Sequence, residues 1–155
     1  MDWRAGAVNI GQLLDSIDGF EQRFESYFTL VRDKSRNNGA RLVSYCLALH
    51  RRQQATVLGG LKPKVVQQAR KKELKSGIVP ELDTLIRVPD SKPEMVTGKE
   101  LIETAIRSNK EMVCVYRAIL TQRAGKEVQA VLTAHVLVKD RDIATLKKML
   151  AMNYF

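Results

Sequence analysis

The sequence is poor in the residues that usually build disulfide frameworks, zinc ribbons and stacking surfaces. Its 155 residues include two cysteines, two histidines and one tryptophan, and aromatic residues make up 6%. The cysteines, Cys46 and Cys114, form no CxxC pair, which argues against both a disulfide framework and a zinc ribbon. No continuous apolar run has transmembrane length. The first residues, Met1 to Arg4, lack the layout of a secretory signal. We therefore expect a cytoplasmic protein without a membrane partner.

Positive charge is the most marked feature of the composition. The formal net charge is +9, and charged residues make up 28% of the chain. Such a balance could attract nucleic acid. The densest basic run, from Lys62 to Lys75, contains no aromatic residues on which bases could stack. We therefore regard nucleic-acid binding as unlikely and interpret the run as a solvated connector.

Apolar residues recur at helical spacing in four long segments. The predicted helices cover residues 9–35, 40–59, 98–122 and 126–152. On the second helix, the predicted buried face carries Leu42, Val43, Cys46, Leu49, Val57 and Leu58. Gly and Asn residues separate the helices of each pair, as expected at helix ends. We predict an all-α fold with a single domain over residues 1–155.

A long connection, residues 61–97, separates the two pairs of helices. Pro63 could begin a short helix that ends near Lys75. Further along, residues 78–88 could hold a short extended piece. Thr97 and Glu100 have the spacing of a capping box at the start of the third long helix. The short turns make each helix pair an antiparallel hairpin, and the long connection predicts a four-helix bundle with one crossover.

A few polar residues interrupt the apolar stripes near the middle of the predicted bundle. They are Glu21, His50, Asn109 and His135, one on each helix, with Asp142 two turns further along the fourth helix. A buried carboxylate and two imidazoles must be satisfied together, because an unpaired buried polar group destabilises a fold. They could bind a divalent metal, or they could hydrogen-bond to one another and to water. We expect Asp142 to pair with a neighbouring Lys or Arg, such as Lys139.

This layout resembles the ferritin-like superfamily, near the rubrerythrin-type di-iron proteins. The resemblance covers about residues 9–152. In that family, glutamates and two Glu-x-x-His motifs from four helices hold the metal. His50 and His135 match the two histidines, and Glu21 is similar in place to the first glutamate. The resemblance implies that Glu21, His50 and His135 bind metal, with Asn109 and Asp142 as weaker candidates.

The sequence departs from the family motif at three of its four carboxylates. Leu47 and Leu132 stand three residues before the histidines, and Asn109 replaces the glutamate of the third helix. A shifted register could instead turn Glu25, Glu103 or Glu111 inward. These departures fit a scaffold with one metal site, for iron, manganese or zinc, or with no metal.

Two hypotheses about function follow from the resemblance. The first is a ferritin-like protein that binds one divalent metal and has a redox or oxidative-stress role. The alternative is a non-catalytic helical module for structure or interaction that has lost the metal. Aromatic residues such as Phe24, Phe28, Tyr154 and Phe155 offer surface for self-association, so we expect a homo-oligomer, with a dimer as the simplest form.

Overall fold

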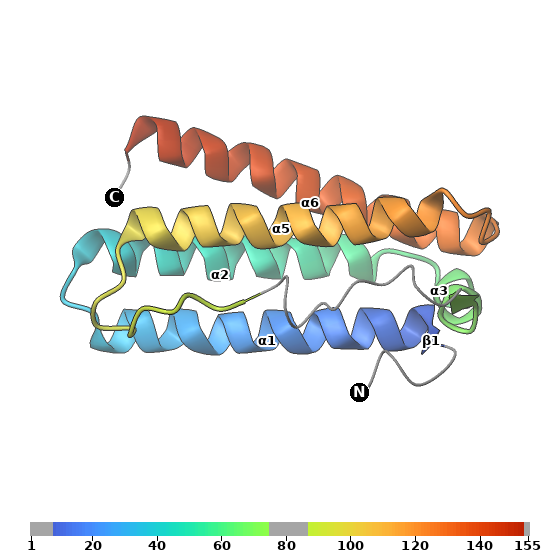
Figure 1. The fold of residues 1–155 in the computed structure, drawn as a ribbon, viewed down its shortest axis with the longest axis horizontal. Helices are drawn as coiled ribbons and strands as arrows, with labels where there is room; N and C mark the ends of the chain where they lie inside the picture. Colours follow the sequence, from blue (N-terminus) through green and yellow to red (C-terminus); the bar gives the residue numbers. More distant parts are fainter. Residues whose placement is uncertain (1–7, 75–86, 154–155) are drawn as a thin grey trace.

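Four long helices make up most of the structure and lie within one or two residues of the predicted ranges (Figure 1). The computed structural model describes residues 8–74 and 87–153. The long helices are α1 (Ile10–Lys34), α2 (Asn38–Gly59), α5 (Gly98–Leu120) and α6 (Lys126–Met152). A shorter helix, α3 (Pro63–Arg70), follows α2. Two-residue strands, β1 (Val8–Asn9) and β2 (Glu73–Leu74), complete the described elements. The all-α class is thus confirmed.

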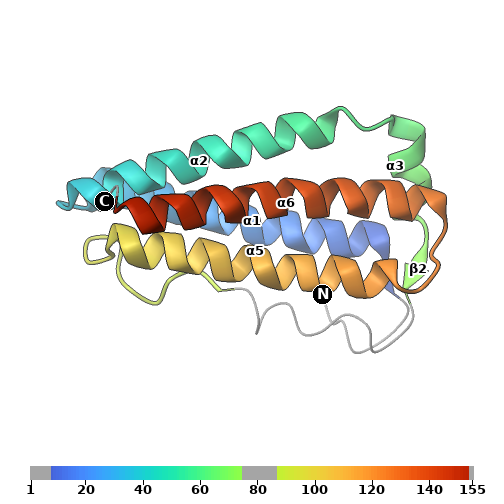
Figure 2. The same ribbon diagram turned by 90° about the horizontal axis from the view of Figure 1, so that it is seen from above.

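The helices form two antiparallel hairpins, as predicted from the short turns. α1 and α2 form the first hairpin, and α5 and α6 form the second (Figure 1). α1 and α6 lie on opposite sides of the assembly, with α2 and α5 between them (Figures 1 and 2). α2 and α5 run in the same direction, so the chain must cross the length of the molecule between them (Figure 1). One crossover between two hairpins is the arrangement that the sequence predicts.

Local capping explains where two of the helices begin. Asn9 and Gln12 form a capping box at the start of α1, with each side chain accepting from the other's backbone N–H. Thr97 caps α5 as predicted, because its hydroxyl accepts from the Glu100 N–H at 3.1 Å. The second half of that predicted capping box is wrong. The Glu100 carboxylate instead accepts from the Ser91 hydroxyl at 2.6 Å, which attaches the crossover to α5.

The crossover packs against one end of the bundle through α3 and through β2, which pairs with β1 next to the start of α1. Pro63 begins α3 as predicted, but the helix ends at Arg70 rather than near Lys75. β1 and β2 pair antiparallel, with Val8 opposite Leu74. The sequence gives no signal for strands this short. Residues 78–86 of the predicted extended piece lie outside the described residues, and residues 87–88 are not in a strand.

The buried face of α2 differs from the predicted face. Leu42, Leu49 and Val57 are exposed, and Leu42 keeps 50% of its surface accessible. The buried residues of α2 are Ala40, Val43, Ser44, Leu47 and Ala48. Four of these five residues are small or β-branched, so α2 can approach its neighbours closely. The prediction is confirmed for Val43 and wrong for Leu42, Leu49 and Val57, because it followed the largest apolar side chains.

The second half of α2 is only loosely covered by the rest of the bundle. No residue from 49 to 59 is buried. Figure 2 shows α2 diverging from α6 toward the end that holds α3. This divergence leaves room for polar side chains and cavities between the helices. Within the described residues, no helix is both long and apolar enough to cross a membrane.

Candidate functional site

Polar side chains from all four long helices meet near the middle of the bundle. The polar layer, as we call this set, consists of Glu21, His50, Gln54, Asn109, Lys139 and Asp142. Helical spacing places them: Gln54 follows His50 by four residues, and Asp142 follows Lys139 by three. Each pair therefore faces the same side of its helix. The layer contains two groups of contacts, one around Lys139 and one around Asp142.

Lys139 provides the positive charge of the polar layer. It is 5% exposed, although lysine is rarely buried without a partner. Its Nζ donates to the Glu21 carboxylate, and it donates to Oε1 of Gln54 at 3.0 Å. These contacts join α6 to α1 and α2. A buried ammonium with two oxygen acceptors is thus satisfied without leaving the interior.

Asp142 is the centre of the second group of contacts. Its Oδ1 lies 2.8 Å from Nδ1 of His50, and its Oδ2 accepts from Nδ2 of Asn109 at 2.7 Å. The carboxylate therefore links α2, α5 and α6 through two short bonds. The expectation that Asp142 pairs with Lys139 is wrong, since Lys139 turns toward Glu21 instead. Because Nδ1 of His50 lies against the Asp142 carboxylate, Nε2 is the ring nitrogen on the side away from that carboxylate.

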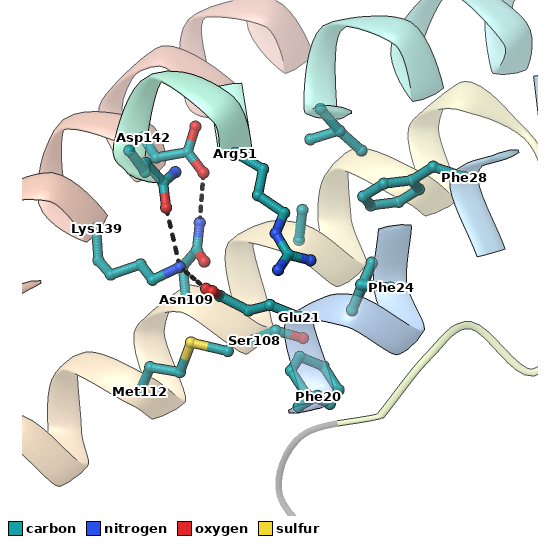
Figure 3. Close-up of a pocket in the computed structure, with 13 residues that line it drawn as sticks. Phe20, Glu21, Phe24, Phe28, Arg51, Ser108, Asn109, Met112, Lys139 and Asp142 are labelled. Atoms are coloured by element: carbon teal, nitrogen blue, oxygen red, sulfur yellow. Dashed lines mark hydrogen bonds and ion pairs between the residues drawn. The ribbon is translucent and has the colours of Figure 1, made fainter. Parts of the chain in front are cut away.

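A pocket with one apolar side and one polar side opens next to the polar layer (Figure 3). Phe20, Phe24 and Phe28 from α1 form its apolar side, and Arg51, Lys139 and Asp142 lie on its polar side. Its volume open to a water-sized sphere is about 60 Å³. That volume suits a few waters or a very small ion rather than an organic substrate.

A second, larger cavity lies between α1, α2, α5 and α6 and is lined in part by His135. The histidine cavity, as we call it, has a volume of about 170 Å³ open to a water-sized sphere. Its polar lining includes Glu21, Tyr116, His135 and Lys139. The His135 and Tyr116 rings are 5.3 Å apart between centroids, at an interplanar angle of 48°. His135 and Tyr116 thus pack against each other at the wall of this cavity, and the Tyr116 side chain has no accessible surface.

Burial controls the protonation of both aromatic groups in the histidine cavity. Burial, reinforced by the charge of Lys139, lowers the pKa of His135 to about 4, and Glu21 opposes this shift. Burial and then the charge of Glu21 raise the pKa of Tyr116 well above its usual value. At neutral pH the cavity therefore holds a neutral imidazole and a protonated phenol, which can accept and donate hydrogen bonds.

The structure brings the five predicted metal ligands into one region but divides them between two groups. His50, Asn109 and Asp142 are joined by hydrogen bonds, whereas Glu21 and His135 line the histidine cavity. Over residues 8–74 and 87–153, no three His, Cys, Asp or Glu side chains lie close enough together to hold an ion. A metal bound by Glu21 would have to displace the Lys139 ammonium, which repels a divalent cation. This arrangement of donors therefore fits a metal poorly.

Sequence reasoning missed Gln54 and Tyr116 as members of the site, and it named Lys139 only as a partner of Asp142. A signal was present for Lys139, which follows His135 by four residues and precedes Asp142 by three. That spacing places all three on one face of α6. The burial of Lys139 and its bond to Glu21 were not predicted, because lysine in an amphipathic helix usually lies in solvent. The alternatives Glu25, Glu103 and Glu111 do not turn into the polar layer, and Glu25 instead lies 3.2 Å from the Arg51 guanidinium.

Comparisons of the chain with models of protein families, with curated proteins and with solved structures found no match.

Proposed function

We propose that this chain is a helical interaction module on the ferritin-like plan, in which Lys139 supplies the positive charge of the bundle interior. The direction of the helices supports the plan, because two antiparallel hairpins joined by one crossover are typical of ferritin-like bundles. Leu47 supports the loss of a metal centre. It stands where the family has a glutamate, and it is buried in the hydrophobic core.

The contacts of Lys139 carry this proposal. In a ferritin-like metal centre, cations neutralise the carboxylates that the four helices turn inward. Here the Glu21 carboxylate is bonded to an ammonium that belongs to α6 itself. Gln54 accepts a second bond from the same ammonium at 3.0 Å. Because Lys139 neutralises the Glu21 carboxylate, the bundle can stay folded without a metal ion in its interior.

Metal analysis of the purified protein tests the proposal. The protein should be produced in medium supplemented with iron, manganese and zinc, and metal per chain should be measured by mass spectrometry. We expect far less than one metal per chain and a melting temperature unchanged by a chelator. About one metal per chain, removed by the chelator with a fall in melting temperature, would contradict the proposal.

The second candidate function is binding of one divalent metal with a redox role. The pairing of His50 with Asp142 favours it, because a carboxylate on one ring nitrogen often orients an imidazole whose other nitrogen binds metal. This candidate requires Lys139 to release Glu21. It predicts iron, manganese or zinc at about one per chain in the wild type and a clear loss in the double variant His50→Ala with His135→Ala. Equal metal content in the two proteins would exclude it.

A further inference from the structure

A pocket between α2 and α6 has a volume of about 270 Å³ open to a water-sized sphere. His50 and Gln53 line it from α2, and Arg141 and Asp142 line it from α6. The His50 pocket, as we call it, differs from the pocket of Figure 3 and from the histidine cavity, since His50 lines neither of those. It places His50 next to a space that is large enough for a small molecule.

Hydrogen bonds hold the His50 ring in one orientation. Its Nδ1 lies 2.8 Å from Oδ1 of Asp142, and Oδ2 of Asp142 accepts from Nδ2 of Asn109 at 2.7 Å. Because an ionised carboxylate only accepts hydrogen bonds, Nδ1 carries the proton of the neutral ring. Nε2 then carries the lone pair, as in the histidine of a Ser-His-Asp triad.

Nε2 of His50 is accessible as well as oriented. The His50 side chain is 19% exposed, and Nε2 forms no hydrogen bond with a described residue. The buried polar side-chain atoms without a partner, among the described residues, belong to Arg32, Ser44, Arg51 and Tyr116. Nε2 of His50 is not one of them, so it keeps accessible surface. An oriented and accessible imidazole lone pair is a nucleophile.

The charges around Nε2 favour an anionic electrophile. Asp142 is the only acidic residue among the described residues that line the pocket, and both its oxygens are already bonded. Arg141 is exposed and takes no part in the ion pairs of the described part of α6, which involve Lys139, Asp140 and Asp142. Its guanidinium repels a divalent cation and attracts an anion. The net charge of +9 acts in the same direction.

We propose that His50 accepts a phosphoryl group on Nε2 from an acyl phosphate. The lone pair of Nε2 attacks phosphorus, and an N–P bond forms while the P–O bond to the acyl group breaks. The acyl group leaves as a carboxylate with the electron pair of that bond. The ring keeps its Nδ1 proton and becomes positively charged, and the Asp142 carboxylate offsets this charge. Arg141 and the Gln53 amide donate to the phosphoryl oxygens.

Incubation of the full chain with acetyl phosphate and a chelator tests the proposal. The chelator is included because a metal on Nε2 would occupy the lone pair. We expect mass spectrometry to show one added phosphoryl group per chain and peptide mapping to place it on His50. The label should be lost in acid and kept in alkali, unlike a phosphate ester of serine or threonine. No added phosphoryl group, or one on another residue, overturns the proposal.

The two histidines provide a matched pair of variants. His50→Ala should abolish labelling, because it removes the acceptor nitrogen. His135→Gln should leave labelling unchanged, because His135 is the other histidine of the chain and does not line the His50 pocket. Labelling of His50→Ala at the wild-type rate overturns the proposal.

Asp142→Asn tests the positioning role of the carboxylate. An amide can turn its NH₂ group toward Nδ1, so the tautomer is no longer fixed, and we expect labelling to slow by at least about tenfold. Asp140→Asn is the control, because Asp140 pairs with Arg117 and does not line the pocket. Nitrogen NMR of the neutral ring at alkaline pH gives a separate readout, with the proton on Nδ1 in the wild type. A wild-type proton on Nε2, or equal labelling rates for wild type and Asp142→Asn, overturns the proposal.

Arg141→Gln tests the contact with the phosphoryl oxygens. Arg141 is exposed, so we expect labelling to slow by about fivefold, the upper range for an exposed ion pair. Lys147→Gln removes the same charge from an exposed position of α6 that does not line the pocket, and it should have no effect. Equal rates for these two variants would overturn the assignment of Arg141 to the site.

Discussion

His135 couples the stability of the bundle to pH. Its pKa is lowered to about 4 in the folded protein, against about 6.5 for a histidine in the unfolded chain. Between these values the unfolded chain binds more protons than the folded protein. Stability therefore falls as pH decreases from about 6.5 toward 4 and is fully present above 6.5.

Replacement of His135 by glutamine should remove this part of the pH dependence. The shift of about 2.5 pH units corresponds to roughly 3 kcal/mol between pH 7 and pH 4. Urea unfolding of wild type and His135→Gln at several pH values measures the difference. We expect the wild type to lose more stability than the variant over this range. Parallel curves for the two proteins would show that the ring is not buried as described.

The bond between Lys139 and Glu21 should be far more costly to break on one side than to remove altogether. Lys139→Met leaves the Glu21 carboxylate without its cation, so we expect a loss of about 3 kcal/mol in the free energy of unfolding. The double variant, Lys139→Met with Glu21→Leu, should recover most of that loss. Denaturant titrations of the wild type, Lys139→Met, Glu21→Leu and the double variant give the coupling energy between the two side chains. Additive effects of the two single variants would contradict the described contact.

At the scale of the element, α2 shows how hydrophobicity alone can misplace a helix face. Leu47 is 5% exposed, whereas Leu42 is 50% exposed. The same substitution at the two positions should therefore have very different effects. We expect Leu47→Ala to destabilise the protein by about 2–5 kcal/mol and Leu42→Ala by less than about 1 kcal/mol. Thermal or urea unfolding measures both. A larger loss at Leu42 than at Leu47 would favour the face predicted from the sequence, and similar losses would contradict the described burial.

The helices themselves could be predicted because their signals are local. Apolar periodicity, the Thr97 cap and the glycines at the helix ends place the boundaries within two residues. The rotation of α2 could not be predicted in this way. It depends on how closely small residues such as Ala40 and Ser44 let neighbouring helices approach, which is a property of the packed bundle.

The same distinction applies to the site. From helical spacing, the burial of Asn109 is predicted correctly. The same spacing correctly predicts that Glu21, His50, His135 and Asp142 lie in one region of the bundle. It could not determine which side chain bonds to which. Whether Asp142 accepts from His50 or from Lys139 depends on differences of a few ångströms between helices far apart in the sequence. That information is set by tertiary packing.

At the scale of the whole molecule, self-association stays a prediction, but the surface on which it was based changes. Phe24 and Phe28 are buried in the core, and Tyr154 and Phe155 lie outside the described residues. Exposed apolar side chains occur instead on the outer face of α2, at Leu42, Tyr45 and Leu49. Their spacing of three and four residues places them on one face of the helix.

A dimer formed through this face of α2 should dissociate when the face is charged. We expect Tyr45→Glu with Leu49→Glu to shift the molar mass measured by light scattering from two chains to one. Both side chains are exposed, so the isolated chain should keep its helical content. Glu103→Gln on α5 is a control away from this face. A wild-type protein with the molar mass of one chain would contradict the predicted dimer.

The basic run of the crossover has less free charge than its composition indicates. Arg70 donates to both carboxylate oxygens of Asp15, at 2.8 Å and 2.9 Å. This bond attaches α3 to α1 and neutralises one of the cations. The structure thus gives part of the run a role in holding the crossover.

The expectation that this run does not bind nucleic acid stays a prediction.

The ammonium between Glu21 and Gln54 is attached covalently to α6. It is made by the ribosome with the rest of the chain, at one equivalent per molecule, and cannot be exchanged, stripped or replaced by a competing ion. The bonds from this ammonium to Glu21 and Gln54 can therefore form during folding, because their cation does not have to be taken up from solution. The time at which these two contacts form is then set by the packing of α1, α2 and α6.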